Sequence, residues 1–312
     1  MNRDEFFEKL PGYVEAEMLE MGITDVSLEE TTVTKHNDTV LHGILFKREG
    51  SFVAPTFYME EFYDAFDGEA DPEIAARQMV RSYLVTGRPW VPEGSIEIDL
   101  EQREDELGFR ILDIEKNRDY LDGVPYRRMC GDLVMIADLT LGGTGEWRTV
   151  VCNEILEDCN YPEEKLFDRA MENTVKNDPP VLTEISDDIH GKSENLIEMD
   201  KENFPRDKVY VLSNTSRRLG AGVIFYPGVA GKVADLAGGY TVVPSSIHET
   251  ILIPDSLQIP VPVMQYMLDD ANSNVVDAKE VLSDRLFHID ETGKMVPMIR
   301  AEYRAEQMSG VQ

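Results

Sequence analysis

The segment from Lys208 to Asp255 constrains the fold more than any other part of the chain. It contains the longest apolar runs and most of the clustered glycines. The run AGVIFY is typical of a buried strand, and VADLAG, which follows the glycine-rich turn Gly228–Lys232, is typical of a helix. We therefore expect a strand-helix-strand unit at the centre of the C-terminal half.

Elsewhere the predicted strands come in hairpins. Val26–Lys35 is rich in β-branched residues and is followed by the turn His36–Asp38 and a second strand, Thr39–Lys47. Asp132–Leu141 turns through Gly142–Gly145 and returns as EWRTVVCN. Because hairpins outnumber β-α-β alternation, the predicted class is α+β, with mixed or antiparallel sheets and flanking helices.

The predicted domain organisation has three parts. Residues 1–176 form an N-terminal α+β part that holds both hairpins, and residues 207–312 form a C-terminal α+β part. Residues 177–206 are polar and contain Pro179-Pro180, which predicts a linker or an exposed excursion. Within the first part, Asp4–Met21 has helical spacing, and Pro11-Gly12 predicts a kink or break in that helix.

The net charge of −30, from 60 acidic and 30 basic residues, limits the partners of this protein. Such an excess repels nucleic-acid phosphates and anionic membranes, so direct binding to either is not expected. Two interpretations stay open. One is a highly soluble acidic protein, and the other is a DNA mimic that occupies a basic partner protein.

The cysteines and the N-terminus bear on the compartment. Cys130, Cys152 and Cys159 form no CxxC pair, which argues against a disulfide framework and favours a reducing compartment. The N-terminus is acidic and lacks the apolar region of a signal peptide, and no apolar run reaches the length of a membrane span. We expect a cytoplasmic protein.

Several motifs resemble a known family across nearly the whole chain. They include MNRDEF, VTKHND, VAPTFYMEEFYDAF, DLVMIADL, AMENT, YVLSNTSRRLGAGVIFYPGVAGKVAD and LSDRLFHID. In these the chain resembles the domain of unknown function 5688 family of uncharacterised bacterial proteins. The resemblance implies an origin in anaerobic bacteria, where a mobile element is one expected carrier of the gene. It assigns no catalytic residue to this chain.

Ser246, His248 and Glu249 are the candidate catalytic residues, because they bring a hydroxyl, an imidazole and a carboxylate together. A serine hydrolase needs a base within hydrogen-bond reach of the nucleophile and a third group that orients the base. No GxSxG elbow is present. The competing interpretation is a turn or short cap, since Ser246 and Glu249 have capping-box spacing.

Three weaker motifs accompany this candidate. Gly228–Lys232 suits a phosphate-binding turn by context but lacks the first glycine and the Ser/Thr of a P-loop, so no cofactor is expected. Arg217-Arg218 could bind a carboxylate or phosphate, or pair within the chain. His288 and Asp290, joined by His248 and Glu249, could form a metal site, although sequence alone leaves the metal unknown.

The sequence therefore favours a non-catalytic protein-interaction or accessory factor with a protein partner. Whether the protein is an enzyme stays open, and a hydrolase or metal-dependent enzyme is the alternative from another class. Trp90, within the Pro- and Gly-rich connector Gly87–Ser95, is a candidate interface anchor.

Overall fold

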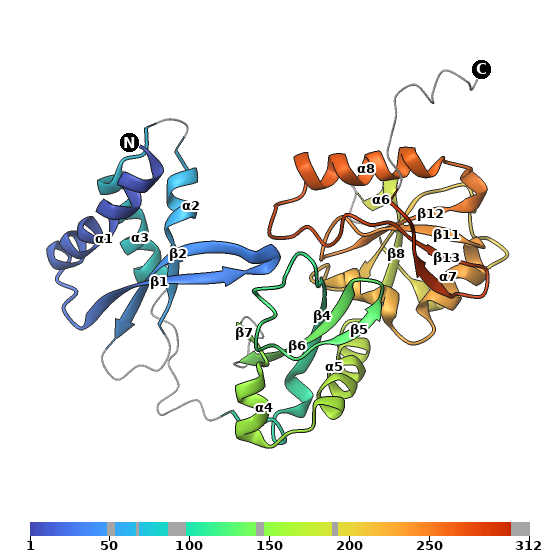
Figure 1. Cartoon of the computed structure of the whole chain (residues 1–312), viewed down its shortest axis with the longest axis horizontal. Coiled ribbons are helices and arrows are strands. Elements are labelled where there is room, and N and C mark those ends of the chain that lie inside the picture. Colours follow the sequence, from blue (N-terminus) through green and yellow to red (C-terminus); the bar gives the residue numbers. More distant parts are fainter. Residues whose placement is uncertain (49–53, 67–68, 87–97, 142–146, 189–192, 301–312) are drawn as a thin grey trace. The chain divides into compact units, whose positions relative to one another are not determined.

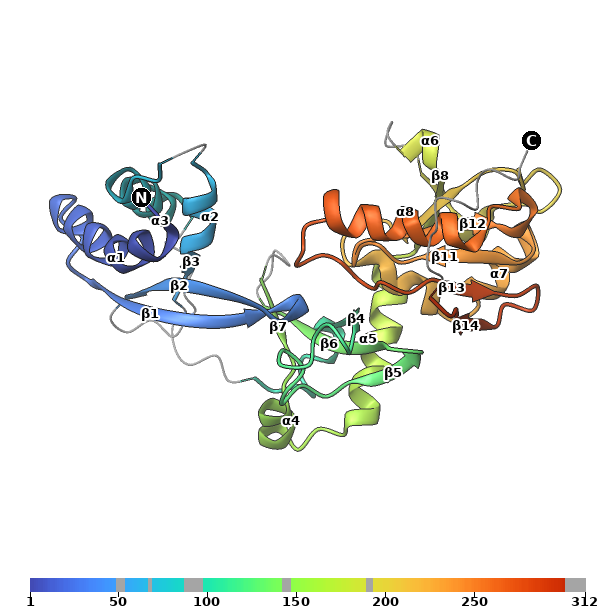
Figure 2. The ribbon, with the colours of Figure 1, turned by 45° about the horizontal axis from the view of Figure 1, so that its top comes forward.

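The computed structural model describes residues 1–48, 54–66, 69–86, 98–141, 147–188 and 193–300. The predicted connector with Trp90 and the turn Gly142–Gly145 lie outside the described residues. Contacts divide the chain into two units (Figures 1 and 2). Unit 1 comprises Met1–Lys35 and Thr39–Glu97, and unit 2 comprises His36–Asp38 and Ile98–Gln312.

Unit 1 is a three-stranded antiparallel sheet, in the order β1-β2-β3, packed with helices. The first hairpin is confirmed, since Val26 pairs with Arg48 at one end and Lys35 with Thr39 at the other. The elements are α1 (Arg3–Glu20), β1 (Val26–Lys35), β2 (Thr39–Arg48), β3 (Thr56–Tyr58), α2 (Met59–Asp64) and α3 (Pro72–Thr86).

Helix α1 corrects one expectation. It runs through Pro11 as a single helix, where the sequence predicted a kink or break. Phe6, Leu10, Val14 and Met18 form an unbroken buried stripe at a spacing of four residues, and their burial outweighs the hydrogen bond that the proline cannot make.

Unit 2 begins with a four-stranded antiparallel sheet in which β4 and the pair β5 and β7 flank β6. Asp138 pairs with Val150 and Leu141 with Trp147, which confirms the second predicted hairpin. Helix α5 lies against β4 and β6 (Figure 1). The elements are η1 (His36–Asp38), η2 (Glu104–Glu106), β4 (Leu107–Asp113), β5 (Arg127–Cys130), β6 (Leu133–Leu141), β7 (Trp147–Val150), α4 (Asn153–Cys159) and α5 (Glu163–Asn177).

The rest of unit 2 is a seven-stranded sheet in the order β14-β13-β11-β12-β10-β8-β9, with antiparallel pairing throughout the described strands. The α+β class is thus observed. The elements are β8 (Pro180–Glu184), α6 (Ile185–Asp188), β9 (Glu194–Asn195), η3 (Leu196–Glu198), β10 (Tyr210–Asn214), η4 (Gly220–Phe225), α7 (Val229–Ala237), β11 (Tyr240–Val243), β12 (Thr250–Pro254), η5 (Asp255–Leu257), α8 (Val261–Asn274), β13 (Phe287–Ile289) and β14 (Met295–Pro297).

Alternation along the strands places different helices on the two faces of this sheet. Val242 and Leu252 belong to the large core that also contains α7, α5 and the four-stranded sheet. Their neighbours Val243 and Ile253 belong to a smaller core with Leu268 of α8. The two sheets of unit 2 therefore share one core, and α8 covers the opposite face.

The structure differs from the sequence expectations at two further places. Residues 177–206, the predicted linker or excursion, contribute β8 and β9 to the sheet, and the division between the units falls after Glu97. The run AGVIFY, the predicted strand, is the 3₁₀ helix η4. A β-carbon on Gly222 would lie 2.7 Å from Cε2 of Phe109, so the glycine lets η4 pack directly against β4.

None of the helices in the described residues is both long and apolar enough to cross a membrane.

Candidate functional site

The predicted catalytic segment connects β11 to β12. Its backbone pairs with a segment of the same unit, since the Ile247 amide donates to the carbonyl of Glu280 and the Leu282 amide donates to that of Ser245. Ser246 is 6% exposed, whereas His248 and Glu249 are half-buried. The segment is a fixed connection within the sheet.

Ser246 and His248 are in contact, but not as a nucleophile and a base. The Ser246 hydroxyl oxygen accepts a hydrogen bond of 3.0 Å from the backbone amide of His248. This is a turn closed by a serine side chain, and the strand β12 follows it, so the predicted turn is observed without the helix that a capping box would begin.

The imidazole of His248 is also engaged. Its Nδ1 accepts a hydrogen bond of 3.1 Å from the Leu219 amide, so the neutral ring carries its proton on Nε2. Nε2 lies 3.6 Å from a carboxylate oxygen of Glu280. The atoms that would activate Ser246 are directed at the loop before η4 and at Glu280.

The residues of the predicted metal site make separate contacts and do not form one cluster. His288 Nε2 lies 3.0 Å from a carboxylate oxygen of Asp255, while the Asp290 carboxylate accepts from the amides of Thr292 and Lys294. Within the described ranges, no group of three or more His, Cys, Asp or Glu side chains could hold a metal ion.

The glycine-rich turn is structural. Gly228, at φ 82°, precedes α7, and Lys232 Nζ donates a hydrogen bond of 2.8 Å to the carbonyl of Met199. The lysine that a phosphate would need is therefore held by the backbone of the same unit.

His248 instead supports the loop between β10 and η4. Leu219, whose amide it holds, has the left-handed φ of 55°. A β-carbon on the adjacent Gly220 would lie 2.6 Å from the His248 carbonyl oxygen and 2.8 Å from the Asn214 amide nitrogen, so this position requires glycine. The loop is packed against the His248 segment without spare room.

Asn214 fixes the loop from the other side. It is 2% exposed, its Nδ2 donates to the Arg218 carbonyl at 2.8 Å, and its Oδ1 accepts from the Arg218 amide at 3.2 Å. The backbone of Arg218 is thus clamped, while its side chain is exposed. A buried amide that satisfies both backbone groups of one residue holds that residue in a defined position.

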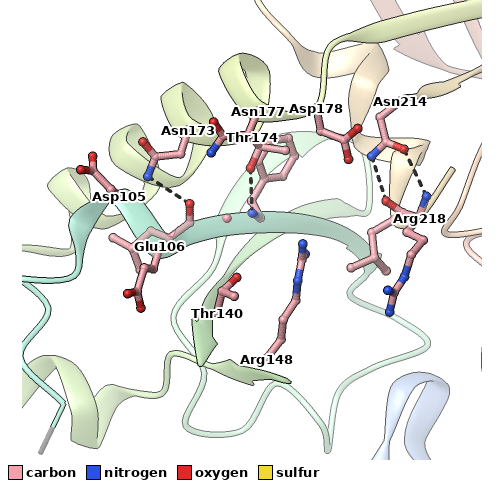
Figure 3. A pocket seen from close by; sticks show the side chains of 14 residues that line it. Asp105, Glu106, Thr140, Arg148, Asn173, Thr174, Asn177, Asp178, Asn214 and Arg218 are labelled. Atoms are coloured by element: carbon pink, nitrogen blue, oxygen red, sulfur yellow. Dashed lines mark hydrogen bonds between the residues drawn. The ribbon is translucent and has the colours of Figure 1, made fainter. Parts of the chain in front are cut away.

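The clamped loop borders a pocket of about 400 Å³ (Figure 3). Its other walls are the start of β4, the C-terminal part of α5 and the hairpin of β6 and β7. The lining residues are Asp105, Glu106, Leu107, Gly108, Phe109, Thr140, Arg148, Asn173, Thr174, Asn177, Asp178, Asn214, Arg218 and Leu219. This volume falls within the range of small-molecule sites.

Side chains of α5 hold the free edge of β4 that forms one wall. Asn173 Nδ2 donates to the Leu107 carbonyl at 3.0 Å, and the Phe109 amide donates to the Thr174 hydroxyl at 3.2 Å. Figure 3 shows both contacts along the pocket. The edge is thereby protected from pairing with another strand.

Charged side chains of both signs line the pocket. Asp105 and Glu106 lie at one end, Arg218 and Asp178 lie toward the other, and Arg148 lies between the two ends (Figure 3). The Glu106 carboxylate accepts from Nε of Arg103 at 2.7 Å, and that of Asp178 accepts from the Ser216 amide at 2.8 Å.

Arg148 and Arg218 are the arginines that line this pocket. In the described part of the chain, no carboxylate forms an ion pair with either guanidinium, and both side chains are exposed. Arg128 and Arg206 of the same unit are also exposed and without an ion pair among the described residues, but they do not line the pocket. Arginines of the same unit that do pair with carboxylates are Arg103, Arg110, Arg118, Arg127, Arg169, Arg285 and Arg300.

A second pocket, of about 320 Å³, is lined by residues of β8, β9 and β10 in the seven-stranded sheet and of the segment before β10. Its charged lining residues are Glu184, Asp187, Glu194, Glu198 and Asp200. Lys208 neutralises part of this charge, with its Nζ 3.1 Å from Glu184. The acidic lining matches the acidity of the whole chain and does not single this pocket out.

Sequence reasoning identified half of the basic pair. The arginines of SRRLG stood out as an anion-binding candidate, and the structure separates them, since Arg217 donates to the Thr183 hydroxyl at 2.9 Å whereas Arg218 lines the pocket. Arg148 had no sequence signal. It is a single arginine in a strand, and only the fold brings its strand to the same pocket as Arg218.

The protein has an α+β fold of two compact units, and two arginines that form no ion pair with the described residues line a polar pocket. The chain belongs to a family of unknown function (DUF5688), whose model matches residues 3–291, and this confirms the family resemblance of the sequence. No curated protein and no solved structure matches the chain.

Proposed function

We propose that this protein is a non-catalytic interaction or accessory factor that acts in the bacterial cytoplasm. Its partner is another protein, and neither a nucleic acid nor a membrane is bound directly. The observation that carries the proposal is the pair Arg148 and Arg218, whose charge is left available in a preformed pocket of an acidic chain. Charge in a pocket that is not neutralised by a neighbouring side chain is typical of a recognition site.

The surface charge supports a protein partner. A net charge of −30 attracts basic surfaces over long distances and repels acidic ones. The same charge is also compatible with a DNA mimic, which is a special case of this function. In that case the basic partner is a DNA-binding protein. Displacement of DNA from such a partner would identify that case.

Affinity purification of the full chain from its bacterial host tests the proposal. We expect a defined partner that forms the same complex when both proteins are purified and mixed. The proposal is wrong if no retained protein reconstitutes a complex with the purified chain.

The alternative function is a hydrolase that uses Ser246, His248 and Glu249. The hydrogen bonds of Ser246 and His248 weigh against it, because the serine oxygen and Nδ1 both accept from backbone amides. A fluorophosphonate probe labels activated serines. Labelling of the wild-type protein that disappears in Ser246→Ala would favour the hydrolase, and we expect no labelling.

A further inference from the structure

We propose that the pocket between β4, α5, β7 and the loop before η4 binds a single carboxylate group of a peptide segment of the partner. This inference rests on the proposed function and names the chemistry that its site recognises. The carboxylate lies between the guanidinium groups of Arg148 and Arg218, and N–H donors of the same peptide face the acidic end of the pocket.

The basic end fits a carboxylate. Arg148 comes from β7 and Arg218 from the clamped loop, so two separate elements supply guanidinium groups to one pocket (Figure 3). Guanidinium groups form short charge-assisted hydrogen bonds with carboxylates, often in pairs. With no carboxylate of the described residues paired to them, both groups are available to a ligand.

The opposite end fits hydrogen-bond donors. Asp105 and Glu106 are exposed carboxylates, and Glu106 already accepts a hydrogen bond from Arg103. Asn173 uses its amide nitrogen on the carbonyls of Glu104 and Leu107, so its side-chain oxygen is left as an acceptor beside them. A second anionic group would be repelled at this end, whereas backbone amides or a lysine would be accepted.

The charge of the chain restricts the ligand further. The net charge of −30 repels an extended acidic peptide or a polyphosphate as either approaches the protein. A peptide with one carboxylate among neutral or basic residues avoids this repulsion. The carboxylate can come from an Asp or Glu side chain or from a free C-terminus, and a pocket of about 400 Å³ has room for one or two residues.

The loop that carries Arg218 is already ordered for binding. His248 holds Leu219, Asn214 holds both backbone groups of Arg218, and Ser213 Oγ donates to the His248 carbonyl at 2.8 Å. A ligand therefore needs to order only the two arginine side chains, and the lost entropy is smaller than for a mobile loop.

Nuclear magnetic resonance of the full chain with ¹⁵N-labelled arginine tests this inference. The probes are acetyl-Lys-Ala-Glu-amide, acetyl-Lys-Ala-Ala with a free C-terminus, the uncharged control acetyl-Lys-Ala-Gln-amide, and inorganic phosphate. We expect saturable shifts of the Nε signals of Arg148 and Arg218 with at least one carboxylate probe, with binding about tenfold or more tighter than the control. The carboxylate probe that binds more tightly identifies the source.

Matched variants locate the binding. Arg148→Gln and Arg218→Gln should each lower the affinity for the carboxylate probe by about tenfold or more, because a charge-assisted contact is lost. Arg81→Gln removes the same charge from an exposed position of α3 in unit 1 and should leave binding unchanged. Equal binding of the Gln control, unchanged binding in both pocket variants, or tighter binding of phosphate would each overturn the inference.

Its failure can be told apart from failure of the proposed function. If a reconstituted partner complex forms equally well with Arg148→Gln and Arg218→Gln, the partner binds elsewhere and only the pocket inference is wrong. If no partner exists but the carboxylate probes bind as expected, the proposed function is wrong and the pocket is a site for a small carboxylate.

Discussion

The His248 segment and the arginine pocket stand in contrast within unit 2. His248 and Ser246 stood out in the sequence, yet both side chains make their hydrogen bonds inside the fold. Arg148 had no distinguishing motif, yet it lines a pocket with Arg218, and neither guanidinium forms an ion pair with a carboxylate of the described residues. The difference is that a polar side chain is available to a ligand only where the fold leaves it unused, and here the imidazole of His248 holds the loop that carries Arg218.

The largest expected effect distinguishes an arginine that pairs with a buried carboxylate, Arg110, from the pocket residue Arg148. Arg110 Nε donates to Asp138 at 2.7 Å, and the Asp138 side chain is 1% exposed. Arg110→Gln leaves that carboxylate buried without its partner, which should cost about 3–5 kcal/mol of unfolding free energy. Arg148→Gln should change stability by no more than about 0.5 kcal/mol. Urea denaturation followed by circular dichroism measures both, and similar losses would remove the distinction between the two arginines.

The second effect tests how tightly the His248 segment is packed against the loop. Gly220→Ala places a methyl group within 2.8 Å of backbone atoms that cannot move independently, and it should cost about 1–3 kcal/mol. Gly231→Ala is the control. Its β-carbon meets nothing within 4 Å, and it lies inside α7, so it should stabilise the protein by about 0.5–1 kcal/mol. Thermal denaturation ranks the two variants, and a tolerated Gly220→Ala would show that the loop is free to shift.

The third effect addresses the role of His248 itself. His248→Ala leaves the Leu219 amide without its acceptor and should destabilise the protein by about 1–2 kcal/mol. Asn carries an oxygen near the position of Nδ1, so His248→Asn should restore most of that loss. Hydrogen exchange at the Leu219 amide reports the bond directly. Exchange that is equally slow in wild type and His248→Ala would contradict the supporting role.

The smallest effect is a dependence of stability on pH. Burial raises the pKa of Asp113 above its ordinary value of 3.8, although a hydrogen bond from Ser283 opposes the shift. At pH values between 3.8 and the raised pKa of Asp113 in the folded protein, the folded state binds more protons than the unfolded state. The contribution of Asp113 to stability therefore falls as pH rises. Asp113→Asn lacks this titration.

The measurement is urea denaturation of both proteins at several pH values. The stability of the wild type relative to Asp113→Asn should be highest below pH 3.8, decline as pH rises, and level off above the folded pKa. A difference that grows with pH would mean that the carboxylate is stabilised by its neighbours and not penalised by burial.

Local patterns predicted much of the secondary structure. His36–Asp38 and the predicted turn Gly142–Gly145 each separate two strand-like runs in the sequence, and the described runs on either side pair as antiparallel hairpins. The helix after Gly228 was also found. These predictions succeed because turn residues and periodicity act over a few neighbouring positions.

Predictions failed where long-range packing outweighed local preference. The buried stripe of α1 carries the helix through Pro11, and AGVIFY becomes η4 because its small residues let it approach Phe109. Pro180 begins β8 within a segment whose polarity resembled a linker. In each case the partner that decides the structure is distant in the sequence.

The sequence by itself determined the α+β class, the hairpins, the family and the excess of negative charge. Only the tertiary structure decided that His248 holds Leu219, that the division between the units follows Glu97, and that Arg148 and Arg218 share a pocket. The physical reason is that composition and periodicity are local properties of the chain. Whether a side chain is already paired depends on neighbours that only folding brings together.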